Sequence, residues 1–186
     1  SAPARSPCTV TRSYELRDDG ANFATVWKTL GWEALQQTVA EAFPGWDTEP
    51  VDHGESRVGI LFRSPHLERP LTLKEISDGM LRYLMLAAAL YCPKEARFLA
   101  FNEPESSLNE SLMPSLARLF HRASRVCQVL VVTHSQTLAC EIAKLTRAEP
   151  IRLRYGDWGT MILDDETSHE PLDDPESDDS NIGDPA

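Results

Sequence analysis

The sequence has no long apolar segment and no closely spaced cysteine pair, and these absences exclude several classes of protein. Its longest nearly unbroken apolar run, Leu84 to Cys92, is far shorter than the ~20 residues that a membrane-spanning helix needs. The first residues, SAPARSPCTV, lack the apolar core of a secretory signal. Without C-x-x-C spacing, the 4 cysteines are expected to be buried, reduced thiols rather than zinc ligands or disulfides. We therefore expect a cytoplasmic protein with no membrane partner.

Basic residues are absent from the end of the chain. From Asp164 onward there are ten acidic residues and no Lys or Arg, which leaves 19 of the 29 acidic residues to balance the 18 basic ones. Ten of the 11 net negative charges therefore belong to residues 164–186, which we predict to be an acidic disordered tail. The remaining sequence is near neutral and has no basic stripe of the kind that binds nucleic acid.

The body of the chain has the composition of one globular domain, with 41% hydrophobic and 25% charged residues. Residues 1–16 are expected to be irregular apart from a short strand within 9–16. The pattern then predicts helices over 18–30 and 32–42, a strand over 57–62, a buried helix over 80–92, a strand over 98–101, a helix over 109–124, a strand over 128–133, a helix over 136–144 and short strands over 151–155 and 160–163. Strands without polar alternation, separated by helices, indicate an α/β fold with a parallel sheet covered on both faces.

Three polar stretches carry the chemistry, and the first is ISDGM at residues 76–80. It opens the buried helix with the hydroxyl of Ser77 and the unencumbered amide of Gly79. The free N–H groups and dipole of a helix N-terminus favour phosphate. The alternative is that Ser77 or Asp78 merely caps the helix.

The second stretch, FLAFNEPE, ends a hydrophobic strand in Asn102 and Glu103, and Pro104 prevents the strand from continuing. Ligands of open α/β sheets bind at the carboxyl ends of the strands. Glu103 could therefore act as a general base on water that attacks a phosphoryl group, a role worth ~10²–10⁴-fold in rate. The alternative is an ordinary strand-to-helix turn with solvated acids.

The third stretch, VLVVTHS, places His134 directly after the next strand and before a helix for which Ser135 is the natural cap. His134 could donate a hydrogen bond to a phosphate oxygen or contact the attacking water. In isolation such a histidine is more often a capping or packing residue.

Taken in order, the three stretches resemble the C-terminal half of an ABC-type ATPase head of the SMC- and RecF-like branch, found in bacterial predicted AAA-family ATPases. In this resemblance ISDGM matches the signature motif, FLAFNEPE the Walker B strand, SSLN the D-loop and THS the switch-histidine loop. The similarity covers residues 17–163 and implies the C-terminal lobe of a P-loop NTPase-type fold.

The resemblance implies ATP hydrolysis with Mg²⁺ at a composite site, formed when two heads join head to tail around two ATP molecules. Glu103 would be the base for the attacking water, and His134 would sense the γ-phosphate. Nucleotide held by the partner head would be contacted by the signature residues Ser77, Asp78, Gly79 and Met80. Ser107 and Leu108 would line the dimer contact.

Two departures from the family pattern qualify this interpretation. None of the 9 glycines is followed by Lys, so the G-x-x-x-x-G-K-[ST] phosphate loop is absent. We therefore expect an N-terminal Walker A lobe as a partner, without which the chain neither binds ATP tightly nor hydrolyses it. Asn102 occupies the position of an aspartate that orders Mg²⁺ through water, and its amide oxygen can accept a hydrogen bond but supplies no charge.

Two other functions compete with this hypothesis. The missing phosphate loop also fits a truncated, non-catalytic interaction module that docks through the signature-helix surface. A metal-dependent nuclease using Glu103, Glu105 and an Asp of the tail is a weaker alternative, because the spacing offers no convincing carboxylate cluster. The process that ATP hydrolysis would drive, and any DNA or effector partner of the completed protein, lies beyond what these motifs specify.

Overall fold

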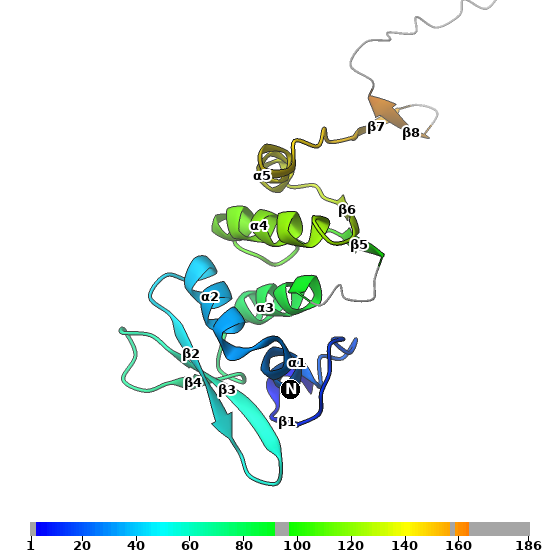
Figure 1. Cartoon of the computed structure of the whole chain (residues 1–186). Helices are drawn as coiled ribbons and strands as arrows, with labels where there is room; N and C mark the ends of the chain where they lie inside the picture. Colours follow the sequence, from blue (N-terminus) through cyan, green and yellow to red (C-terminus); the bar gives the residue numbers. More distant parts are fainter. Residues whose placement is uncertain (1–2, 92–96, 157–158, 164–186) are drawn as a thin grey trace, which may run out of the picture. The chain divides into compact units, whose positions relative to one another are not determined.

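The structure, a computed structural model, describes residues 3–91, 97–156 and 159–163 (Figure 1). The chain divides into two compact units, Ser1–Glu149 and Pro150–Ala186. Residues 3–16 pack as part of the first unit, where Ala4 is 3% exposed, so the packing shows no boundary at residue 16. The predicted acidic tail and Cys92 lie outside the described residues.

The first unit opens with a short 3-10 helix, η1 (Pro3–Arg5), a short strand, β1 (Cys8–Thr9), and two helices, α1 (Phe23–Leu30) and α2 (Trp32–Ala42). The predicted strand over 9–16 is wrong apart from its first residue. Helix α1 also starts later than predicted, because Gly20 turns the chain with φ 66°. A Cβ at Gly20 would lie 2.7 Å from the Cβ of Ala4, so this turn requires glycine.

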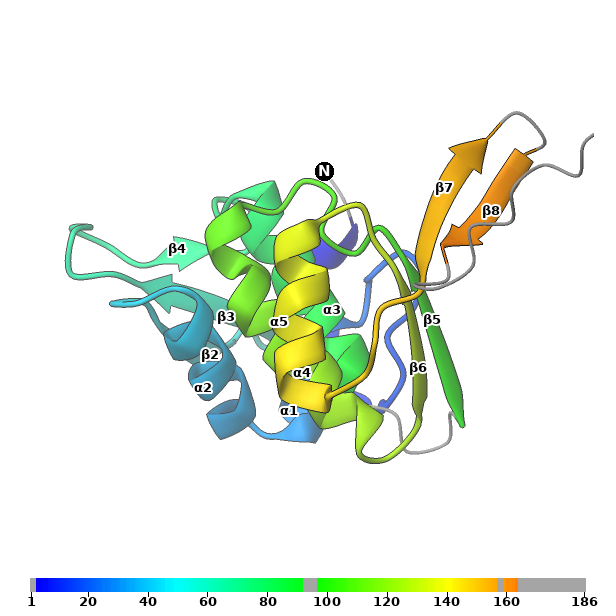
Figure 2. The same ribbon diagram turned by 90° about the horizontal axis from the view of Figure 1, so that it is seen from above.

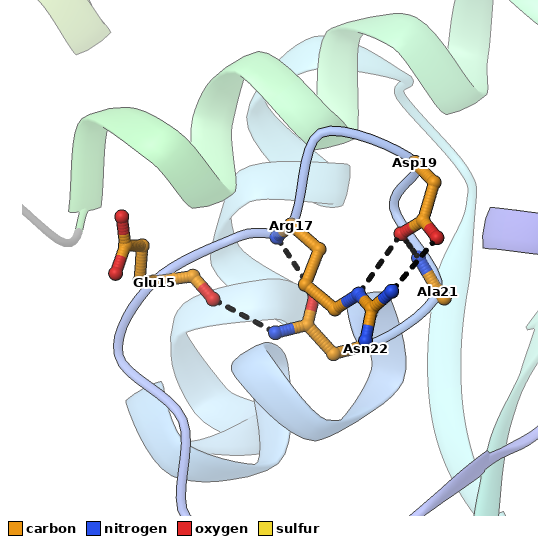
Figure 3. A network of polar contacts seen from close by, with 5 residues as sticks. All are labelled: Glu15, Arg17, Asp19, Ala21 and Asn22. Carbon is orange, nitrogen blue, oxygen red and sulfur yellow. Dashed lines mark hydrogen bonds and ion pairs between the residues drawn. The ribbon is translucent and has the colours of Figure 1, made fainter.

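A polar network holds the loop before α1 in its non-helical path (Figure 3). The guanidinium of Arg17 donates to both carboxylate oxygens of Asp19 at 3.1 Å, and the Ala21 N–H donates to the same carboxylate at 2.9 Å. The Ala21 N–H and then Arg17 hold the pKa of Asp19 below its usual value. The side chain of Asn22 accepts from the Arg17 N–H at 3.0 Å and donates to the Glu15 carbonyl at 2.8 Å. These bonds compete with the helix that the sequence pattern predicted.

An antiparallel sheet follows, in which β3 (Arg57–Arg63) pairs with β1, β2 (Asp47–Asp52) and β4 (Leu71–Thr72). The prediction of β3 is confirmed, and its residues Val58, Ile60 and Phe62 are buried in the core. The sequence DTEPVD of β2 escaped prediction because it is acidic and contains Pro50. Such a strand is tolerated at a sheet edge, where β2 lies.

Helix α3 (Asp78–Tyr91) confirms the predicted buried helix. It packs against α1 on one side and α4 (Met113–Ser124) on the other. Its buried residues are Met80, Leu81, Tyr83, Leu84, Ala87, Ala88 and Leu90. On the remaining face Arg82 is exposed and Met85, Leu86 and Ala89 are half-buried, and because most of these side chains are apolar too, the helix has little amphipathic character.

The remaining elements of the first unit are β5 (Phe98–Asn102), a 3-10 turn η2 (Glu110–Leu112), α4, β6 (Gln128–Val132) and α5 (Gln136–Thr146). Strands β5 and β6 pair in parallel, as predicted. One face packs on the helices (Figure 2). The rings of Phe101 on β5 and Phe120 on α4 lie 5.2 Å apart. On the other face Phe98, Leu130 and Val132 are 51%, 50% and 44% exposed. The prediction of a parallel sheet covered on both faces is therefore wrong for the described residues.

The second unit contains one antiparallel hairpin, formed by β7 (Arg152–Gly156) and β8 (Gly159–Leu163). The structure confirms these two predicted strands. Leu153, Tyr155 and Ile162 are all more than half exposed. An isolated two-stranded hairpin is marginal in water.

The cysteines agree only in part with the expectation of buried thiols. Cys127 is buried, Cys8 is half-buried and Cys140 is exposed, because it lies on the outer side of α5. All three are free thiols. Across the ranges that the structure describes, no helix combines the length and the apolar content needed to cross a bilayer.

Candidate functional site

The signature stretch forms a capped turn at the start of α3. The Met80 N–H donates to the Ser77 hydroxyl oxygen at 3.1 Å, so the capping alternative is confirmed for Ser77. Ser77 and Asp78 are exposed and Gly79 is half-buried. The Ser77 hydroxyl can still donate, so capping leaves it available to an anion. Met80, in contrast, is 5% exposed and packs in the core, and its contact with nucleotide stays a prediction.

Arg5, near the start of the chain, holds this turn in place. The sequence patterns did not predict this role. Its guanidinium donates to the carbonyl oxygens of Leu73 and Ile76 at 2.7 and 2.8 Å and forms an ion pair with Asp78. The side chain of Arg5 is 12% exposed, whereas that of Asp78 is 96% exposed. Arg5 thus fixes the backbone that leads into the signature turn.

The predicted Walker B edge lies where β5 and β6 end. Asn102 is the last residue of β5 and is exposed. The Glu103 N–H donates to the Val132 carbonyl at 2.8 Å, and Glu103 has a left-handed backbone with φ 46°. Its Oε1 lies 3.4 Å from Nε2 of His134, and its Oε2 accepts from the Ser106 hydroxyl at 3.2 Å. The structure thus brings the predicted base and the predicted phosphate sensor together.

Glu105 belongs to the same site, although the sequence pointed to it only as a nuclease ligand. Its Oε1 accepts from the Thr133 hydroxyl at 2.5 Å, from the His134 N–H at 3.0 Å and from the Ser135 N–H at 3.2 Å. Burial alone would raise the pKa of Glu105, but these hydrogen bonds outweigh it and hold the pKa below the usual 4.5. Ser135 accepts from the Leu138 N–H at 3.1 Å and so caps α5 as predicted.

The predicted D-loop touches the signature turn within the same chain. Ser107 is exposed with φ 66°, and Leu108 is half-buried against the core. A Cβ on Gly79 would lie 3.2 Å from the carbonyl oxygen of Ser107, so glycine permits this close approach. An open groove of about 450 Å³ runs over this surface, lined by Leu16, Asp78, Leu81, Arg82, Met85, Leu86, Ala89 and Ser107.

The donor groups at the strand ends fit part of a magnesium site. Within the described ranges, no group of three or more His, Cys, Asp and Glu side chains could hold a metal ion. Magnesium is commonly held by one or two carboxylates together with water and substrate phosphates. Asn102 and Glu103 can offer one amide oxygen and one carboxylate to such a site. The nuclease alternative gains no support, because Oε1 of Glu105 is already engaged by three donors.

Comparison with known proteins gives one family match. The model of the family described as "AAA domain, putative AbiEii toxin, Type IV TA system" matches residues 11–141. That range contains all of the signature, Walker B, D-loop and switch-histidine residues predicted above. A search of the curated proteins found no match.

Solved structures of SMC proteins share the fold. An SMC ATPase studied for its ATP-driven dimerization and DNA-stimulated activation is 16% identical with a TM-score of 0.57, covering 77% of this chain and 87% of that one. An SMC head bound to the C-winged helix domain of ScpA is 19% identical (TM-score 0.52; 71% of this chain, 42% of that one). The SMC head domain from Thermotoga maritima is 18% identical (TM-score 0.52; 79% and 51%). The mixed α/β fold and its likeness to SMC heads are thus confirmed, while the chain spans about half or less of the last two.

Proposed function

Because the chain belongs to the family described as "AAA domain, putative AbiEii toxin, Type IV TA system", we propose that it supplies the signature, Walker B and switch-histidine half of an ABC-type ATPase head. The observation that carries this proposal is the 3.4 Å approach of Glu103 to His134 at the ends of two parallel strands. These two residues lie 31 positions apart in the sequence, and a carboxylate base beside an imidazole at a strand end suits hydrolysis of a phosphoanhydride.

In this proposal the chain's residues act mainly by position, since phosphoryl transfer depends on placement and charge stabilisation. Glu103 takes the proton of the attacking water, and His134 donates a hydrogen bond to the γ-phosphate. Mg²⁺ would neutralise charge on the phosphates, with Asn102 holding one of its waters. The Ser77 hydroxyl and the Gly79 N–H bind the γ-phosphate of ATP held by a second head.

The surface of the unit supports two partners for such a site. The exposed face of β5 and β6, with Phe98, Leu130 and Val132, suits an N-terminal lobe that carries the missing phosphate loop. The contact of Gly79 with Ser107 puts the signature and the D-loop on one surface, which suits a head-to-tail homodimer. The SMC ATPase with 16% identity dimerises with ATP and is activated by DNA, and DNA or a protein effector is the corresponding proposal for the completed protein.

Calorimetry with ATP tests the division of the site between two lobes. The 186-residue chain alone should show no tight binding of ATP with Mg²⁺, because it has no G-x-x-x-x-G-K-[ST] loop. The same chain joined to a Walker A lobe should bind and hydrolyse ATP. Tight binding by the chain alone would overturn the proposed division.

Substitution of the base tests the chemistry. In the completed protein, Glu103→Gln should reduce turnover by ~10²–10⁴-fold while ATP still binds and holds the dimer together. Glu110→Gln is the matched control, since Glu110 is an exposed glutamate on the same connection and its carboxylate accepts from the Thr137 hydroxyl at 2.7 Å. Unchanged turnover in Glu103→Gln removes Glu103 from the catalytic role. Absence of turnover in the completed protein with Glu103 intact would instead favour the non-catalytic interaction module, for which the exposed apolar face is the supporting observation.

A further inference from the structure

Glu105 connects the two strand ends of the site through a single oxygen atom. Its Oε1 is the acceptor for the Thr133 hydroxyl and for the backbone N–H groups of His134 and Ser135. We propose that Glu105 is the positioning residue of the switch-histidine loop, which sets the distance between His134 and the carboxylate of Glu103. Glu105 touches neither substrate nor reacting atoms in this role.

The direct contact between Glu103 and His134 cannot hold the histidine loop by itself. The His134 side chain is 85% exposed and its Nε2 lies 3.4 Å from the Glu103 carboxylate, beyond the range of a strong hydrogen bond. Two of the three bonds to Glu105 come instead from the backbone of the loop, and the third comes from the Thr133 hydroxyl. The bonds from the Thr133 hydroxyl and the His134 N–H are shorter than the Glu103–His134 contact by 0.4 Å or more. Hydrogen bonds to an ionised carboxylate are about twice as strong as neutral ones.

The turn at Pro104 gives the two glutamates their separate tasks. Pro104 lies between them in the sequence and is buried, and Glu103, which precedes it, adopts the left-handed backbone conformation. The Glu103 side chain thereby meets the imidazole of His134, while the Glu105 side chain meets the backbone that carries this imidazole. This one turn thus positions both the carboxylate of Glu103 and the backbone of His134.

The hydrogen bonds that Glu105 accepts are concentrated on one of its two carboxylate oxygens. Oε1 accepts all three bonds from the histidine loop, whereas Oε2 is buried and accepts no hydrogen bond from any residue that the structure describes. This concentration of bonds on a single loop is what a positioning residue requires.

Amide hydrogen exchange on the 186-residue chain, measured residue by residue with NMR, tests the proposal without requiring any activity. Glu105→Ala should accelerate exchange of the His134 and Ser135 amides by roughly 10- to 100-fold, because each loses a charged acceptor. Glu105→Gln, which keeps a neutral acceptor oxygen, should recover part of the protection. Glu110→Ala is the matched control, because its carboxylate accepts from the Thr137 hydroxyl but from no amide of the loop.

The amide of Leu84 in the buried helix α3 separates a local effect from a loss of overall stability. The proposal requires that exchange at Leu84 accelerate much less in Glu105→Ala than exchange at His134 and Ser135. Equal acceleration at Leu84, His134 and Ser135 would mean that Glu105 only stabilises the fold, and unchanged exchange at His134 and Ser135 would mean that it does not hold the loop. Either result overturns the proposal. If Glu105→Ala does not fold, Glu105→Gln and Thr133→Val decide the question by the amide of His134, because the Ser135 N–H also donates to the Thr133 hydroxyl oxygen at 3.0 Å.

The consequence for catalysis rests on the proposed function and has its own readout. In the completed protein, Glu105→Ala should lower kcat at least tenfold with little change in KM for ATP, and Glu105→Gln should restore part of kcat. A wild-type kcat in Glu105→Ala overturns the positioning role. No ATP turnover in any variant, combined with the expected exchange at His134 and Ser135, would refute the proposed function and leave the loop assignment intact.

Discussion

The two sheets of the first unit differ in how completely they are covered. In the antiparallel sheet, one side of β3 is buried through Val58, Ile60 and Phe62, and this sheet needs no more than one covered face. In the parallel pair, the inner residues pack on the helices while Phe98 and Leu130 on the outer face are half exposed. Parallel strands are normally covered on both faces. The sheet with the exposed outer face is also the one whose strand ends carry Glu103 and His134. The exposed apolar face and the proposed site therefore belong to the same pair of strands.

The largest expected effect compares the same substitution in the two sheets. Phe62→Ala on β3 should destabilise the chain by ~3–5 kcal/mol, since Phe62 is 0% exposed and its removal leaves a cavity. Phe98→Ala on β5 should cost less than ~1 kcal/mol, since half of this ring already contacts water. Urea unfolding of both variants gives the two free energies directly.

Protein concentration provides the control for that comparison. If the exposed face of β5 and β6 is covered by a second copy of the chain, the cost of Phe98→Ala will grow with protein concentration. A cost for Phe98→Ala equal to that for Phe62→Ala in a dilute monomer would show that the two sheets are equally covered, and the contrast would then be wrong.

Substitution of Arg5 is expected to cause an intermediate loss of stability. Arg5→Ala should destabilise the chain by ~2–3 kcal/mol, because it leaves the carbonyl oxygens of the buried residues Leu73 and Ile76 without their donor. Asp78→Asn should cost less than ~1 kcal/mol, because Asp78 is almost fully exposed. Similar costs for both variants in thermal unfolding would mean that the ion pair, rather than the backbone contacts, holds the signature turn.

Local sequence patterns were sufficient to predict most elements and the motifs of the site. The helices over α3 and α4, the strands β5 and β6, and the cap at Ser135 all rest on signals within a few residues. Glu103 and His134 were predicted separately, each from its own strand end. Their mutual contact follows from the parallel register, in which Asn102 pairs with Val132.

The features that escaped prediction depend on contacts between distant segments or on local conflicts. Arg5 acts on a turn about 70 residues away, and Glu105 acts on a loop 28 to 30 residues away. Neither residue stands in a motif whose spacing encodes these partners. Strand β2 contains Pro50 between acidic residues and is stabilised by its pairing with β3 and by the hydrogen bond from the Gln36 side chain to the Thr48 carbonyl at 3.0 Å. Such contacts form in the folded chain between distant segments, so local sequence patterns do not encode them.

The smallest expected effect concerns acid pH and compares one carboxylate from each sheet region. Next to the antiparallel sheet, Glu75 accepts from Arg69 at 2.6 Å and from the Thr72 N–H and hydroxyl at 2.9 Å, which lowers the pKa of Glu75 to about 2. Because the folded pKa is depressed, the stabilisation is present above the usual 4.5 and is lost as the pH falls from 4.5 toward 2. Glu105 at the parallel pair also has a lowered pKa, so its contribution to stability should begin to fall as the pH drops below 4.5.

Glu75→Gln should therefore reduce the Tm at neutral pH and flatten the decline of the Tm below pH 4.5, with exposed Glu68→Gln as the control. An acid decline as steep in Glu75→Gln as in the wild type would show that Arg69 and Thr72 do not select the ionised carboxylate.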